Sequence, residues 1–154
     1  MPINIQGWIE YSPYEDEKER EDQDAWITWM NVSSLIDFND EINWIIFGNP
    51  RDFNNDTPKF KPIAKNRGFP NNPSDELKAD IQWIRELEVE YGKGGIFGFS
   101  YFYFSEVDKI NWKKDYGVSI VESDWGKLFE LTEKFKALRQ ITSEQIRLTV
   151  WYNW

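Results

Sequence analysis

The chain of 154 residues contains no cysteine and no histidine. Without cysteine, a disulfide framework, a thiolate nucleophile and an iron–sulfur site are excluded. Without histidine, a Ser–His–Asp triad, an HExxH zinc site and an imidazole proton shuttle are excluded. A metal ion would have to be held by oxygen ligands, as Mg²⁺ and Ca²⁺ are. We therefore expect no cofactor, no resident metal ion and no catalytic residue.

Long apolar runs are also missing. Runs such as 44–47 are short, whereas a membrane-spanning helix needs about 20 apolar residues. The first residues do not combine a basic patch with a hydrophobic stretch, so no signal peptide is visible. These absences predict a cytoplasmic protein that does not bind a membrane.

The charge is strongly negative, because 27 Asp and Glu face 18 Lys and Arg, which leaves a net charge of −9. Binding to double-stranded nucleic acid is not expected, since neutralising phosphates requires an excess of basic side chains. An acidic chain can instead dock on a basic partner protein. Aromatic residues make up 18% of the chain, with nine Trp, and this abundance leaves a homodimer interface open as an alternative.

Hydrophobic periodicity predicts one α+β domain over residues 1–154, with a mainly antiparallel sheet covered by helices. Alternation predicts strands at 3–11, 25–32 and 145–154, and a short strand at 116–121. The bulky segment 96–104 is typical of a strand buried on both sides or of an extended aromatic segment. A short helix is expected with Asp40 and Glu41 in its first turn, ended by Gly48. Further helices are expected from Ser74 to about 91, from Ser105 towards Trp112, and from Ser123 onward, the last with Leu131 and Leu138 facing inward.

Two segments depart from the average charge. Residues 15–24 carry seven acidic and two basic side chains, which predicts a solvated hairpin tip or a docking surface for a basic protein. Residues 49–73 form a long loop rich in Pro, Asn and Asp, and between Thr57 and Ser74 it has four cations and no acid. Cations bind phosphate and aromatic rings stack on bases. The sequence therefore predicts a nucleotide-like ligand held by this loop and the nearby aromatic segment, through Arg51, Lys59, Phe60, Lys61, Lys65, Arg67, Phe69, Ser100 and Tyr101.

Three stretches resemble an uncharacterised bacterial and phage protein family. The opening MPINIQGWIE is similar to that family's start, Met-Gly-Cys-Asp-Ile-His; PIAKNRGFP at 62–70 resembles its Pro-Ile-Ala-x-x-Arg-Gly-x-Pro block; and IRLTVWYN at 146–153 resembles its Val-Arg-x-Val-Phe-Trp-Phe-Asp-Asn terminus. Here Ile3, Asn4 and Gln6 replace the family's Cys, Asp and His, so no metal or catalytic role carries over. The resemblance implies a compact fold and an origin on phages or other mobile elements, and hence the cytoplasm of a host cell.

Three functions follow as hypotheses. The first is a non-enzymatic protein, encoded by a phage or mobile element, that sequesters a small anionic nucleotide-like ligand against host defence. The second is an acidic immunity-type inhibitor that caps a basic enzyme through residues 15–24 and exposed tryptophans. The third is a hydrolase that uses carboxylates and Mg²⁺.

Overall fold

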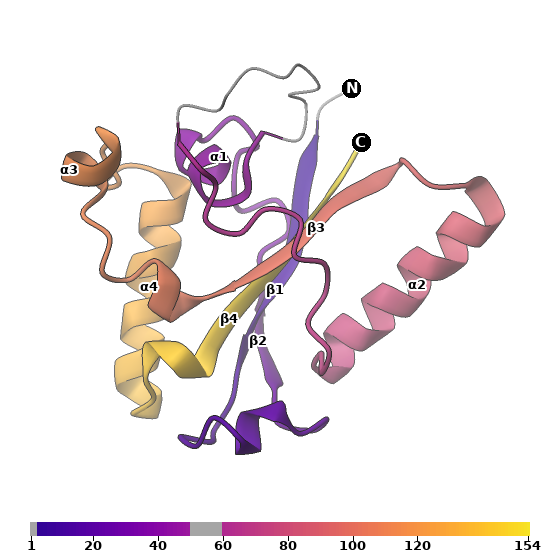
Figure 1. Cartoon of the computed structure of the whole chain (residues 1–154), viewed down its shortest axis with the longest axis horizontal. Helices are drawn as coiled ribbons and strands as arrows, with labels where there is room; N and C mark the ends of the chain where they lie inside the picture. Colours follow the sequence, from indigo (N-terminus) through magenta and orange to yellow (C-terminus); the bar gives the residue numbers. More distant parts are fainter. Residues whose placement is uncertain (1–2, 50–59) are drawn as a thin grey trace.

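Four strands form one antiparallel sheet in a computed structural model that describes residues 3–49 and 60–154 (Figure 1). The strands are β1 (Asn4–Tyr11), β2 (Ile27–Asn31), β3 (Ile96–Tyr103) and β4 (Ile146–Asn153), in the spatial order β2-β1-β4-β3. The first two strands form the predicted hairpin. The α+β class with an antiparallel sheet and covering helices is confirmed.

The register of β1 on β4 separates the two faces of the sheet. Ile9 lies opposite Leu148 and Ile5 opposite Tyr152, whereas Glu10 lies opposite Arg147. Because side chains alternate between faces along a strand, the apolar pairs point to one side and the charged pair to the other. Both faces are buried, since seven of the eight residues of β4 are buried.

Helices cover both faces, and the sheet lies between α2 and α4 (Figure 1). The helices are α1 (Glu41–Phe47), α2 (Asp75–Tyr91), α3 (Trp112–Tyr116) and α4 (Asp124–Arg139), with 3-10 turns η1 (Glu19–Glu21), η2 (Phe104–Glu106) and η3 (Ser143–Gln145). Side-chain caps fix the beginnings of α1 and α4. Asp40 Oδ1 accepts a hydrogen bond from Ile42 N, and Ser123 Oγ accepts one from Gly126 N. Within the described residues, no helix has both the length and the apolar character needed to cross a membrane.

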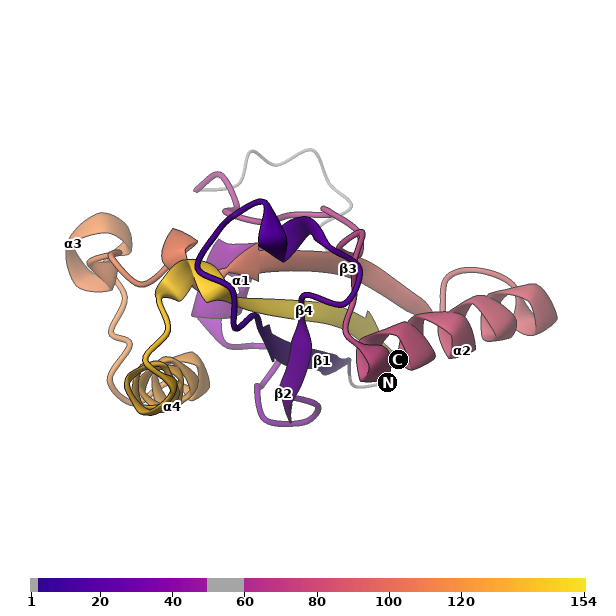
Figure 2. The same ribbon diagram turned by 90° about the horizontal axis from the view of Figure 1, so that it is seen from below.

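The apolar residues form two clusters. The larger one packs α1, α3 and α4 against one face of the sheet, with Trp125 and Phe102 among its fully buried members. The smaller one packs Leu77, Ile81 and Ile84 of α2 against Trp151 on the other face. The end of α2 extends past the strands (Figure 2), and Tyr91 is accordingly exposed.

Residues 60–70 run along the outer edge of β3. Gly68 N donates to Phe99 O at 3.0 Å, and Arg67 N donates to Ser100 Oγ at 3.1 Å. The same segment also reaches α1, where Ala64 N donates to Ile46 O at 2.7 Å. An uncovered edge strand exposes unpaired backbone groups, and this part of the expected functional loop covers the sheet edge at Phe99 and Ser100.

Three local expectations are wrong. Residues 117–121 form no strand, because α3 occupies 112–116 and ends at Gly117 in the left-handed conformation. The expected helix from Ser105 is replaced by the turn η2, and α3 begins only after Asn111 caps it. Leu131 and Leu138 are exposed, because the face of α4 that packs on the core is narrower than expected. Its buried residues are Trp125, Leu128, Thr132 and Phe135. In addition, segment 96–104 contains an edge strand, β3, most of whose side chains are half-buried.

Candidate functional site

A buried ion pair lies at the end of the sheet where the chain leaves β1. Arg147 Nε donates to Glu10 Oε1 at 2.8 Å, and the two side chains are 1% and 0% exposed. Glu10 Oε2 also accepts from Ser74 N at 2.6 Å, just before α2. The Arg147 guanidinium lies 4.1 Å from the centre of the Trp26 ring. Both charges are therefore satisfied inside the protein, which a buried ion pair requires.

Asn72 links this ion pair to residues 12–26, which join β1 to β2 and are called the acidic connection below. Asn72 accepts from Arg147 through Oδ1 at 3.0 Å and through its carbonyl oxygen at 2.8 Å. Its Nδ2 donates to Arg20 O at 2.8 Å and to Asp22 O at 2.9 Å. Trp26 Nε1 donates to Arg20 O as well, at 2.9 Å. The middle of the acidic connection is thus hydrogen-bonded to the body of the protein.

The start of the acidic connection is held in the same way. Ser12 N donates to Gln145 O at 2.8 Å, and Gln145 Nε2 donates to Ser12 O at 3.0 Å. Both residues are buried. The expected solvated hairpin tip is therefore exposed in its side chains and ordered by its backbone contacts.

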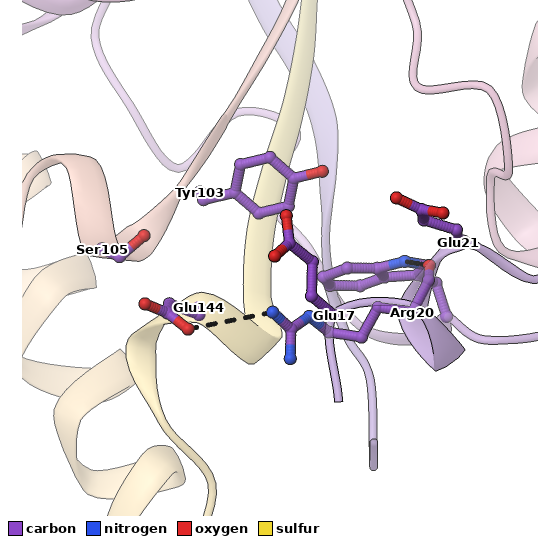
Figure 3. Close-up of a pocket in the computed structure, with 7 residues that line it drawn as sticks. Glu17, Arg20, Glu21, Tyr103, Ser105 and Glu144 are labelled. Atoms are coloured by element: carbon purple, nitrogen blue, oxygen red, sulfur yellow. Dashed lines mark hydrogen bonds and ion pairs between the residues drawn. The ribbon is translucent and has the colours of Figure 1, made fainter. Parts of the chain in front are cut away.

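A pocket opens between the acidic connection, the end of β3 and η3 (Figure 3). Its volume is about 270 Å³, and we call it the acidic pocket. Glu17, Arg20 and Glu21 come from the acidic connection, and Glu144 comes from η3. The remaining lining residues are Trp26, Tyr103 and Ser105.

The one cation in the acidic pocket is committed to acceptors of its own chain. Arg20 Nη1 donates to Glu15 O at 2.6 Å and to Tyr14 O at 3.2 Å, and Arg20 Nη2 lies 3.8 Å from Glu144 Oε2 (Figure 3). The Arg20 side chain is 11% exposed, whereas that of Glu144 is 70% exposed. Within the described residues, the carboxylates of Glu17 and Glu21 have no hydrogen-bond or ion-pair partner. The pocket therefore presents net negative charge to an incoming group.

The size and chemistry of the acidic pocket suit a basic side chain. Its volume lies below the range of roughly 300–1,000 Å³ typical of small-molecule sites. Carboxylates bind a guanidinium through short, charge-assisted hydrogen bonds. The aromatic ring of Tyr103 adds a surface that attracts a cation.

Arg67 and Ser100, two of the residues expected to bind a nucleotide, have hydrogen-bond partners within the chain. The Arg67 guanidinium donates to Glu106 at 2.8 Å through both Nη atoms, and also to the carbonyl oxygens of Ile63 and Tyr101. Ser100 is buried and donates to Ala64 O. Lys61 and Lys65 are exposed.

The Arg67–Glu106 pair shifts both pKa values. The hydrogen bond that Arg67 donates to Glu106 raises the pKa of Arg67 above its ordinary value. Burial by itself raises the pKa of Glu106, but hydrogen bonds from Arg67 and Tyr103 N outweigh burial, so the pKa lies below the ordinary 4.5. Arg67 is therefore already neutralised by a carboxylate at the position where a phosphate was expected.

The aromatic residues of the expected nucleotide site are divided between the two faces of the sheet. Phe60 packs against the larger apolar cluster, with its ring 5.0 Å from that of Tyr116. Phe69 packs in the smaller cluster, 4.8 Å from the ring of Phe99. Tyr101 is half-buried, with its ring beside that of Tyr103. Arg51 and Lys59 lie outside the described residues, so one shared phosphate site on this loop stays a prediction.

Part of the acidic pocket could not be anticipated from sequence. Glu17 and Glu21 belong to the acidic block at 15–24 that was expected to dock a partner. Glu144 and Tyr103 reach the pocket from distant parts of the chain. No local pattern marks either of them, because their proximity depends on β4 lying between β1 and β3.

Carboxylates do not gather into a metal site in the described part of the chain. No group of three or more acidic side chains there could hold a metal ion. The carboxylate and Mg²⁺ hydrolase stays a prediction that no described cluster supports.

No protein-family model matches the chain, and no curated protein or solved structure matches it. The function therefore has to be argued from the geometry described above.

Proposed function

We propose that the protein is a non-enzymatic binding protein that uses the acidic connection and the acidic pocket to hold a basic partner protein, as an immunity-type inhibitor does. The observation that carries this proposal is the acidic pocket: three glutamates surround a concave site whose single arginine is occupied internally. An Arg or Lys of the partner would enter this pocket.

The surrounding charge supports a protein partner more than a small molecule. All seven acidic residues of 15–24 are exposed, and they extend the negative surface beyond the pocket. Complementary charge of this kind accelerates association and excludes wrong partners. The ligand of this surface is therefore a basic protein surface from which one side chain projects.

The acidic connection is held in place by hydrogen bonds, and this fixed conformation supports tight binding. Hydrogen bonds from Asn72, Trp26 and Gln145 hold its backbone before any partner arrives. A surface ordered in advance loses less conformational entropy on binding than a flexible loop does. We propose the cytoplasm as the compartment in which the protein acts. The origin on a mobile element that the resemblance implies is compatible with this role.

The test uses two matched peptides, acetyl-Gly-Arg-Gly-amide and the same peptide with citrulline, a neutral analogue of arginine. NMR follows the indole N–H of Trp26, which lines the acidic pocket. We expect the arginine peptide to shift this resonance and the citrulline peptide to leave it unchanged. The Glu17→Gln/Glu21→Gln/Glu144→Gln variant should lose the response.

A control variant with the same change in net charge is Glu88→Gln/Glu90→Gln/Glu122→Gln, whose residues lie outside the acidic pocket. It should respond to the arginine peptide like the unmodified protein. An equal response of Trp26 to both peptides, or an equal loss in both variants, would overturn the proposal.

A further inference from the structure

A second pocket lies between α2 and residues 69–73, and Gln23 of the acidic connection also lines it. Its volume is about 580 Å³, within the range of roughly 300–1,000 Å³ of small-molecule sites. We call it the α2 pocket. It is lined by Gln23, Phe69, Pro70, Asn71, Pro73, Lys78, Ile81, Gln82 and Arg85.

The helix contributes one polar stripe to the α2 pocket. Lys78, Gln82 and Arg85 follow one another at spacings of four and three residues, which places them on one side of α2. Ile81 borders this stripe and also belongs to the apolar cluster under the helix. The packing of α2 against the sheet therefore sets the side of the helix on which the two cations lie.

The opposite wall is rigid. The ring of Phe69 contacts that of Phe99 at 4.8 Å and that of Trp151 at 6.0 Å. Asn72, between Asn71 and Pro73, is bound to the buried Arg147. The α2 pocket thus exists without a ligand and does not need to be formed by one.

The lining of the α2 pocket is positive in a chain whose net charge is −9. It includes Lys78 and Arg85 and no carboxylate. Within residues 3–49 and 60–154, neither cation forms an ion pair, and their side chains have no hydrogen-bond partner. The guanidinium of Arg67, by contrast, donates hydrogen bonds to the carboxylate of Glu106. The free donors of Lys78 and Arg85 are available to an anion.

The remaining lining groups favour an anion that carries a planar ring. Phe69 offers an aromatic ring for stacking. The amides of Gln23, Asn71 and Gln82 can both donate and accept hydrogen bonds, as the edge of a nucleobase requires. Gln82 Nε2 donates to Glu86 Oε1 at 3.3 Å, so its oxygen is the atom that remains free to accept.

We infer that the α2 pocket binds a nucleoside diphosphate or triphosphate. The Cα atoms of Lys78 and Arg85 are roughly 10 Å apart along the helix axis, at 1.5 Å per residue. A diphosphate or triphosphate chain can contact both cations, whereas a single phosphate contacts one of them. The α2 pocket is thus inferred to bind the same class of ligand that the sequence predicts, and Phe69 belongs to both sites. Its cations are Lys78 and Arg85 of α2, whereas the sequence predicts cations of the loop 49–73.

Calorimetric titration with ADP, AMP, adenosine and inorganic phosphate tests this inference. We expect ADP to bind more tightly than AMP, and adenosine and phosphate to bind weakly. The Lys78→Gln/Arg85→Gln variant should bind ADP at least about tenfold more weakly, because it loses the charge-assisted hydrogen bonds to the phosphates.

Two controls make the result specific. The Lys93→Gln/Lys127→Gln variant changes the net charge equally and uses lysines outside the α2 pocket, so it should bind ADP normally. The triple glutamine variant of the acidic pocket should bind ADP normally as well. Near-UV circular dichroism and the unfolding temperature verify that each variant is folded. The inference is overturned if ADP does not bind, if phosphate alone binds as tightly as ADP, or if Lys78→Gln/Arg85→Gln leaves the affinity unchanged.

Discussion

Glu10 and Arg147 face each other across β1 and β4 and form an ion pair at 2.8 Å that is almost completely shielded from water. The pair also holds Asn72, Ser74 and the ring of Trp26. One buried contact therefore connects the sheet, the start of α2 and the acidic connection. Trp26 also lines the acidic pocket, and Asn71 and Pro73, the neighbours of Asn72 in the sequence, line the α2 pocket.

Removing one member of the pair should be costly. Arg147→Met leaves the Glu10 carboxylate buried without its partner, and we expect it to lower the free energy of unfolding by about 3–5 kcal/mol. The double variant Glu10→Gln/Arg147→Met removes both charges and should be less destabilised. Urea unfolding monitored by tryptophan fluorescence measures both. A double variant as unstable as Arg147→Met, or less stable, would contradict this account.

Asn72→Ala should loosen the acidic connection. It removes the two hydrogen bonds that Asn72 Nδ2 donates to Arg20 O and Asp22 O, together with the one that Asn72 Oδ1 accepts from Arg147. At about 0.5–1.5 kcal/mol each, their loss should speed local opening roughly tenfold. Limited trypsin digestion should show faster cleavage after Lys18, which is exposed in the connection.

Cleavage after Lys93 provides the internal control for this experiment. Lys93 is exposed in the turn between α2 and β3, far from Asn72 in the sequence. Its cleavage rate should stay the same in Asn72→Ala. Equal acceleration at Lys18 and Lys93 would show that the whole protein had been destabilised.

The Arg67–Glu106 pair should contribute a pH-dependent part of the stability. Because the pKa of Glu106 is lower in the folded protein than the ordinary 4.5, its contribution is present above about pH 4.5 and is lost as the pH falls through the folded value. Glu106→Gln should therefore destabilise the protein at neutral pH, and the difference from the unmodified protein should shrink on acidification. Urea unfolding between pH 7 and pH 3 measures it, with the exposed Glu122→Gln as the control. A difference that stays constant with pH would contradict the assignment.

An alanine at position 98 of the edge strand β3 should destabilise the protein in two ways, through its backbone conformation and through a steric clash. Its φ is +69°, and an added Cβ would run into the ring of Tyr152. Gly98→Ala should lower the free energy of unfolding by about 1–2 kcal/mol because of the left-handed backbone, and the clash should lower it further. Gly117 has φ +70° in the left-handed region and open space around it, so Gly117→Ala should show only the backbone cost. Thermal unfolding compares the two, and equal losses would show that the Tyr152 contact is unimportant.

The elements of the fold that rest on local patterns were predictable. The alternation over 145–154 predicted a strand, and β4 spans Ile146–Asn153. Helix caps predicted α2 after Ser74 and α4 after Ser123. The expected strand at 116–121 failed because the pattern there is only six residues long, and Asn111 and Gly117 specify a short helix instead.

The candidate sites were predictable only in part. The acidic block at 15–24 is visible in the composition, and three of the seven residues that line the acidic pocket come from it. The basic loop was equally visible, yet Arg67 lies against Glu106, a contact that spans 39 positions. Lys78 and Arg85 were overlooked as ligands, although their helical spacing was available as a signal.

The sequence by itself determined the charge of this protein, its lack of thiol and imidazole chemistry, and the positions of its main strands and helices, since these depend on composition or on residues a few positions apart. Only the tertiary structure decided which charges are free. The order β2-β1-β4-β3 brings Arg147 to Glu10 and Glu144 to Glu17, while the packing of α2 leaves Lys78 and Arg85 without acidic partners. Whether a charged side chain is neutralised depends on neighbours that are distant in the chain, and the folding of the whole sheet selects those neighbours.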